Sequence, residues 1–277
     1  MSLVLGLLVA ASFGSGDFLG GLASRQMPTV TAVGIAQLSA LIGAIVVAAI
    51  AGGSPGAQDL ALGAGAGLLN VTALACLYQG LAIGQIGVVA PLTSVIAAII
   101  PVGWALLVGE RPSPLALVGV ALAIGAGALI SRDPDETPSE GSSRALLLAV
   151  AAGSAFGLSF ICYAATGHDS GLWPVLTARV TAVLVVAAFV LVTRAPLAPR
   201  RQPATQAAVA GVLDITATTL LLIAVRAGLT ATVAPVAALA PGFTVGHARW
   251  YLHEKTSRLQ LVGLGVALVG LVLIATG

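Results

Sequence analysis

The sequence predicts an all-α integral membrane protein with ten transmembrane helices, arranged as two inverted five-helix repeats. Of its 277 residues, 58% are hydrophobic and 8% are charged, whereas a soluble domain carries roughly 25% charged residues to face water. Ten apolar runs reach the length of a membrane span, and the second half of the chain aligns with the first. These features exclude a soluble fold.

Nine polar or Pro/Gly-rich breaks separate the ten apolar runs, the longest being SRDPDETPSEGSSR at 131–144. A membrane helix needs about 20 apolar residues, and the runs do not alternate as membrane strands would. The first run lacks a basic leader and contains Asp17, so we expect a helix rather than a signal peptide. The predicted spans are 3–23, 30–51, 60–81, 86–108, 115–130, 145–165, 172–192, 206–225, 230–251 and 259–276.

The two halves of the chain repeat each other. Residues 84–119 align without a gap onto 228–263, at an offset of 144. Apolar composition produces chance identities, but it does not readily bring Pro, Glu and polar residues into register. The matched pairs include Pro91 with Pro235, Glu110 with Glu254, Gly119 with Gly263, Asn70 with Asp214 and, at an offset of 142, Gln37 with Arg179.

These matches predict a first repeat at 1–131, a polar linker at 132–144 and a second repeat at 145–277. Five spans is an odd number, so the second repeat enters the membrane from the opposite side. Inverted repeats are typical of secondary transporters, whose binding site lies near the midplane between the repeats. A duplication without functional meaning is the alternative.

The sequence resembles the drug/metabolite transporter superfamily, in its ten-helix form with two EamA-type domains. The resemblance rests on a Pro early in the fourth span of each repeat, then a Glu, then a Gly-rich fifth span, as in VVAPLTSVIAAIIPVGWALLVGERPSPLALVGVALAIGAG. Arg179 fits an arginine frequent in the second span of the family, and Gln37 departs from it. The bacterial YddG-type amino-acid and metabolite exporters are nearest in size and layout. The resemblance implies that spans 1, 3, 4, 6, 8 and 9 line a central cavity, with the fifth and tenth helices packed at the ends.

Three ionisable residues lie inside predicted spans, where such groups usually face a cavity or a partner. Asp17 lies in GSGDFLGG, surrounded by glycines, and faces the apolar Phe160 in the repeat alignment. This asymmetry favours substrate or proton chemistry at Asp17. A salt bridge to an arginine such as Arg179 is the alternative.

Asn70 and Asp214 make one position polar in both repeats, and Thr218 lies one turn beyond Asp214. Substrate or proton binding and interhelical hydrogen bonding are both open for this pair. Arg179 is expected either in a structural ion pair or at a cavity mouth, where it would bind a substrate carboxylate.

Other candidate site residues are hydroxyl and aromatic side chains inside spans. The predicted substrate-binding residues are Asp17, Asn70, Tyr78, Thr93, Ser94, Tyr163, Asp214 and Thr218. Prolines inside spans bend helices and point to transport sites, so gating bends are predicted at Pro91, Pro101, Pro235 and Pro241. The two cysteines, Cys76 and Cys162, lie in apolar runs and suggest no metal site; no cofactor is expected.

These features predict a secondary active transporter that exports small polar metabolites, amino acids above all, by alternating access across the bacterial inner membrane. Efflux of drug-like cations is the alternative substrate class. The expected partners are a small-molecule substrate, the lipid bilayer and protons. A net charge of +2 without a basic run gives no reason to expect nucleic acid, and no catalytic set of an enzyme and no P-loop is present. The internal pseudo-symmetry favours a functional monomer over a channel oligomer.

Arginine and lysine in the loops predict the orientation. The breaks after spans 1, 5, 7 and 9 hold nine of these residues, and the breaks after spans 4 and 8 hold two. Because cytoplasmic loops carry the excess of Lys and Arg, this distribution places both chain ends outside the cytoplasm. Members of the resembled superfamily are often drawn with their termini inside.

Overall fold

The computed structural model describes residues 2–107, 109, 113–130, 140–226, 237, 239–254 and 257–276. Throughout these residues the regular structure is helical, and they contain no strand. The elements are α1 (Ser2–Ser24), α2 (Thr29–Ala51), α3 (Ala57–Ile83), α4 (Ile86–Leu107), α5 (Pro114–Ile130), α6 (Glu140–Ala164), the short 3-10 helix η1 (His168–Ser170), α7 (Trp173–Thr193), α8 (Arg201–Arg226), α10 (Ala240–Tyr251) and α11 (Arg258–Thr276).

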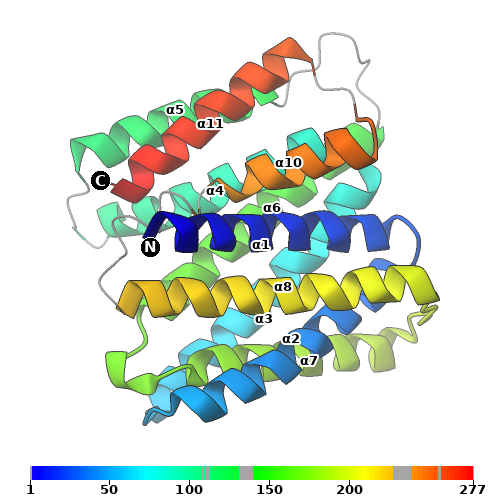
Figure 1. Cartoon of the computed structure of the whole chain (residues 1–277), viewed down its shortest axis with the longest axis vertical. Helices are drawn as coiled ribbons and strands as arrows, with labels where there is room; N and C mark the ends of the chain where they lie inside the picture. Colours follow the sequence, from blue (N-terminus) through cyan, green and yellow to red (C-terminus); the bar gives the residue numbers. More distant parts are fainter. Residues whose placement is uncertain are drawn as a thin grey trace.

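The helices lie side by side in a bundle (Figure 1). Eight of them are long and apolar enough to cross a membrane, and α5 is a shorter apolar helix. Their bounds follow the predicted spans closely. The ninth predicted span, 230–251, is represented by α10 at 240–251, while 227–236 and 238 lie outside the described residues.

The packing of one repeat recurs in the other. Helix α1 packs on α8 as α6 packs on α3, and α2 packs on α8 as α7 packs on α3. Successive helices reverse direction, so five crossings place the start of α6 on the face opposite the N-terminus. The fold is therefore two inverted five-helix repeats.

Two glycines show this symmetry at the level of atoms. A Cβ on Gly67 of α3 would overlap the backbone of Ala178 on α7, and a Cβ on Gly211 of α8 would overlap the backbone of Ala36 on α2. Gly67 and Gly211 are repeat mates, as are Ala36 and Ala178. The missing side chains let the two helix pairs approach at backbone distance, which is how membrane helices gain packing energy without a hydrophobic drive.

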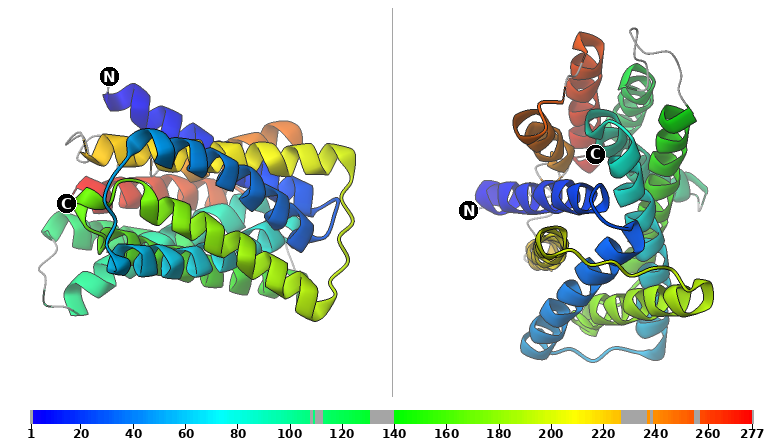
Figure 2. Two further views of the ribbon diagram at one scale, coloured as in Figure 1. Left: turned by 90° about the horizontal axis from the view of Figure 1, so that it is seen from below. Right: turned by 90° about the vertical axis from the view of Figure 1, so that its right-hand side faces the viewer.

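Helices α5 and α11 lie together along one edge of the bundle, and α2 and α7 form the other edge (Figures 1 and 2). The resemblance implied that the fifth and tenth helices pack at the ends; the structure places both at the same edge. At their crossing, Gly119 of α5 faces Gly270 of α11.

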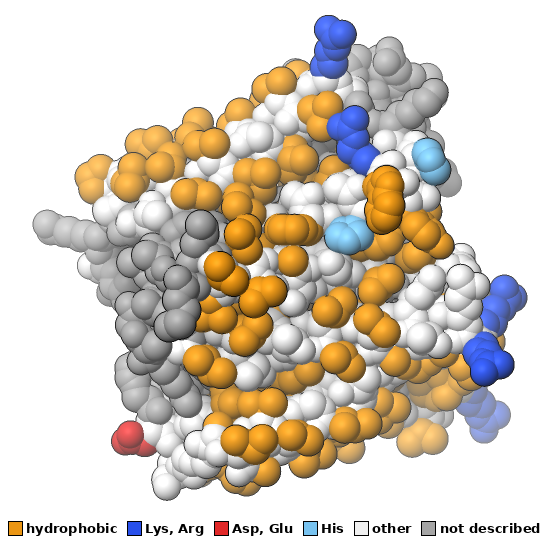
Figure 3. Space-filling model, viewed as in Figure 1, with side chains coloured by type: hydrophobic (Ala, Val, Ile, Leu, Met, Phe, Trp, Pro, Cys, Tyr) orange, Lys and Arg blue, Asp and Glu red, His pale blue; other side chains and the backbone are white. Residues whose placement is uncertain are grey.

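The face seen in Figure 3 carries many hydrophobic side chains, and its Lys and Arg side chains lie toward one end of the helices. We call that end the basic face: it holds the α1–α2 turn, the α3–α4 turn, the α7–α8 loop and the α10–α11 loop. Its exposed cations include Arg25, Arg194, Arg200, Arg201 and Arg258. The opposite face holds both chain termini and the loops before α3 and α7 (Figure 1).

Candidate functional site

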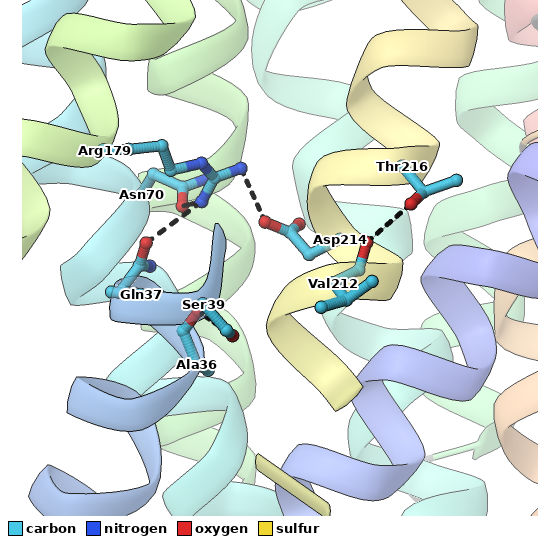
Figure 4. A network of polar contacts seen from close by, with 8 residues as sticks. All are labelled: Ala36, Gln37, Ser39, Asn70, Arg179, Val212, Asp214 and Thr216. Carbon is cyan, nitrogen blue, oxygen red and sulfur yellow. Dashed lines mark hydrogen bonds and ion pairs between the residues drawn. The ribbon is translucent and has the colours of Figure 1, made fainter. Parts of the chain in front are cut away.

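A polar cluster of four side chains, called the central cluster below, lies where α2, α3, α7 and α8 meet (Figure 4). The Arg179 guanidinium on α7 forms an ion pair with the Asp214 carboxylate on α8, with Nη2 and Oδ2 2.5 Å apart. Its Nη1 donates to Gln37 Oε1 on α2 at 3.2 Å and to Asn70 Oδ1 on α3 at 3.3 Å. The Arg179 side chain is 3% exposed, so the guanidinium is held by protein groups from three other helices.

The cluster consists of two pairs of repeat mates, Gln37 with Arg179 and Asn70 with Asp214. Residues that are equivalent in two inverted repeats meet where the pseudo-two-fold axis passes. Each position is neutral in the first repeat and charged in the second. The amide oxygens of the first repeat therefore solvate the cation of the second, which offsets part of the cost of burying an ion pair.

Asp17 lies beside this cluster but outside it. Its neighbour Gly16 faces Leu213 and Asp214 of α8, while Gly20, one turn on, lies against the ring of Tyr78 on α3. Asp17 therefore sits between α3 and α8, where it interacts electrostatically with Tyr78 and Asp214.

Arg179 pairs with Asp214 and not with Asp17, which corrects the alternative that the sequence left open for Asp17. Within the part of the chain that the structure describes, Asp17 forms no ion pair or hydrogen bond. Among the described residues, two carboxylates, Asp17 and Asp214, lie beside the single guanidinium of Arg179. With all three groups ionised, these described groups carry a net charge of −1.

The other predicted site residues divide between this centre and its surroundings. Tyr78 is buried at 2% exposure, and Tyr163 of α6 interacts electrostatically with Arg179 and Asp214. Thr93 of α4 donates to Ala149 O of α6 at 3.3 Å, so its hydroxyl bridges two helices. Ser94, next to it on α4, is half-buried.

Thr218 lies further along α8, in a depression between α2, α7 and α8. Its walls are mostly apolar: Ala44, Val47, Leu172, Val175, Ile215, Thr218 and Thr219. The structure thus separates Thr218 from Asp17 by placing it among residues of α2 and α7.

Of the four prolines, Pro101 and Pro241 do not occupy equivalent places in the two repeats. Pro91 and Pro101 lie inside α4, which continues through both. Pro241 lies in the first turn of α10, where a proline costs no helical hydrogen bond. Pro235 lies outside the described residues.

One set of contacts was not anticipated as functional. On the basic face, the backbone N–H of Ile86 donates to Glu254 Oε1 at 2.7 Å, and Gln260 Nε2 donates to Gln85 Oε1 at 3.4 Å. Burial raises the pKa of Glu254, and the Ile86 hydrogen bond and the charge of Arg25 offset only part of that effect. The match of Glu110 with Glu254 between the repeats is the sequence feature that points to this position.

Comparisons with known proteins agree with this architecture. The model of the EamA-like transporter family matches residues 1–132 and 143–276. A solved crystal structure matches with a TM-score of 0.63 and 14% identity, covering 98% of this chain and 95% of that one; identity at this level shows the fold alone. The comparison with curated proteins found no match. The chain thus belongs to the EamA-like transporter family and is a multi-pass membrane transporter of the drug/metabolite transporter superfamily, moving a small molecule across the bilayer rather than catalysing a reaction.

Proposed function

We propose that this transporter exports small polar metabolites that carry an ammonium group, amino acids above all, by alternating access across the bacterial inner membrane. The observation that carries the proposal is the Asp17 carboxylate, which lies beside the central cluster without an ion-pair partner among the described residues. A charge inside a membrane protein is costly unless paired. A substrate ammonium supplies the missing cation.

The same geometry argues against Arg179 as the group that recognises a substrate. Both terminal nitrogens of its guanidinium are engaged by Asp214, Gln37 and Asn70. A substrate carboxylate would have to displace Asp214 to reach it. Recognition of the ammonium by Asp17, with the Tyr78 ring alongside, requires no such rearrangement.

Drug-like cations are the alternative substrate class, because they would present the same positive charge to Asp17. Asp17 also provides a site for proton exchange, because a carboxylate that binds an ammonium in turn with a proton couples the two fluxes.

The two repeats, 1–131 and 145–277, are the units that we expect to rock against each other, joined by the linker at 132–144. Inverted repeats transport by such motion around a site at their interface. Because both repeats are in one chain, a monomer contains the complete pathway.

Purified protein in liposomes tests the proposal through counterflow of radiolabelled amino acids, sugars and cationic dyes. We expect wild type to exchange amino acids, Asp17→Asn to reduce exchange at least tenfold, and Asp17→Glu to retain part of it. Asp169→Asn, at an exposed carboxylate on η1, is the matched control and should exchange at the wild-type rate. Exchange of cationic dyes without amino acids would replace the proposed substrate class, and full activity of Asp17→Asn would remove Asp17 from the site.

A further inference from the structure

The α3–α4 turn on the basic face is held by two kinds of bond. Arg25, at the end of α1, donates from Nε to Leu81 O at 3.0 Å and from Nη2 to Gly84 O at 3.1 Å. These bonds stay within the first repeat. They satisfy carbonyl groups at the end of α3, which lack helical partners, and they would move with that repeat as one body.

The second kind of bond joins the two repeats. Glu254, in the α10–α11 loop, accepts the backbone N–H of Ile86, the first residue of α4, at 2.7 Å. Gln260, in the first turn of α11, donates to Gln85 at 3.4 Å. Glu254 and Gln260 belong to the second repeat, whereas Ile86 and Gln85 belong to the first.

Burial makes the Glu254 bond important to the closed arrangement. Ile86 is fully buried, and a buried N–H without an acceptor is costly. The carboxylate also lies at a helix N-terminus, where the peptide dipoles favour it. The contact is therefore stable while the basic face is closed, and it has to break before the repeats can separate there.

We propose that Glu254 is the latch of the basic face: its hydrogen bond to the first residue of α4 holds the two repeats together there and breaks each time that face opens. This inference rests on the alternating-access part of the proposed function. Glu254 is a positioning residue, because it acts through α4 and touches no substrate.

Accessibility of a buried cysteine reports opening directly. Val89 lies one turn into α4, is 1% exposed and packs against Gly80 of α3 and Gly84 of the α3–α4 turn. In a background with Cys76 and Cys162 replaced by alanine, Val89→Cys should react slowly with a membrane-impermeant maleimide present on both sides of the liposome. Glu254→Ala should raise its labelling rate about tenfold, which corresponds to about 1.4 kcal/mol in favour of the open state.

Two further variants separate a latch from general stability. Glu254→Gln keeps an oxygen in reach of the Ile86 N–H and should label like the parent. Glu254→Asp keeps the charge but is one methylene too short, so it should label like Glu254→Ala. If Glu254→Ala or Glu254→Asp fails to fold, as judged by size-exclusion chromatography, the other of the two supplies the measurement.

The location control is Asp59→Ala on the opposite face. Asp59 Oδ1 accepts the backbone N–H of Gly167 at 2.7 Å, which is also a bond between repeats. This variant removes that bond and should leave Val89→Cys labelling unchanged. Unchanged labelling in folded Glu254→Ala and Glu254→Asp, or an equal rise in Asp59→Ala, would overturn the latch. Absence of counterflow in wild type would instead refute the proposed function.

Discussion

The Arg179–Asp214 ion pair makes a strong prediction about stability. Asp214→Asn removes the anion while Arg179 stays buried at 3% exposure, leaving a guanidinium that only amide oxygens solvate. Removing one partner of a buried ion pair costs about 3–5 kcal/mol. At about 2–4 °C per kcal/mol for a chain of 150–250 residues, the thermal midpoint should fall by roughly 6–20 °C.

The pseudo-symmetry of the cluster provides a rescue. Asn70 Oδ1 already lies 3.3 Å from Arg179 Nη1, so Asn70→Asp places a carboxylate on the other side of the same guanidinium. The double variant Asn70→Asp with Asp214→Asn should recover most of the lost stability. Asn70→Asp alone adds a second carboxylate to the cluster and should be less stable than the double variant.

Thermal unfolding in detergent, followed by tryptophan fluorescence, measures these differences. Thr216→Ala is the control, because Thr216 is exposed on α8 and donates only to Val212 O of its own helix. It should stay within about 0.5 kcal/mol of wild type. The reasoning fails if Asp214→Asn melts like wild type, or if the double variant melts no higher than the single one.

Two further predictions concern helix packing and pH. Gly67→Ala and Gly211→Ala should each destabilise the protein by about 1–3 kcal/mol in the same melting assay, because their Cβ atoms overlap Ala178 and Ala36; Gly103→Ala, with open space around it, should not. Raising the pH above 4.5, the ordinary pKa of Glu254, should increase Val89→Cys labelling relative to labelling in the Glu254→Gln background at the same pH. Burial in the closed state raises that pKa, so protonation favours the closed state and its stabilisation is lost as pH rises. Dividing the two rates removes the general rise in thiolate fraction with pH, and a ratio that falls with pH would contradict the sign.

The sequence alone was sufficient for the fold, because membrane spans are read from length and hydropathy and because the repeat brings polar residues into register. The alignment paired Asn70 with Asp214 and Gln37 with Arg179, and a structural ion pair was one of the two alternatives for Arg179. That all four side chains meet at one point, with Gln37 among them, came from the structure.

Which side chains of the site bond to each other could not be predicted from the sequence. Whether Arg179 turns toward Asp214 or Asp17 depends on the rotation of α7 and α8 about their axes, which the close approach at Gly67 and Gly211 sets. Rotation also decides that Thr93 bonds to α6. The Glu254 contact depends on a loop conformation, for which hydropathy carries no information.

The division of charge in the central cluster bears on how the two halves of the chain depend on each other. Two copies of the first repeat, assembled about the same axis, would bring together four neutral amides from Gln37 and Asn70. Two copies of the second would crowd two arginines and two aspartates into the same buried volume. Only the unlike pair places one cation against one anion with amides around them. The two halves are therefore not interchangeable. Neither repeat could form this ion pair with a second copy of itself, and the ion pair leaves Asp17 available to a solute.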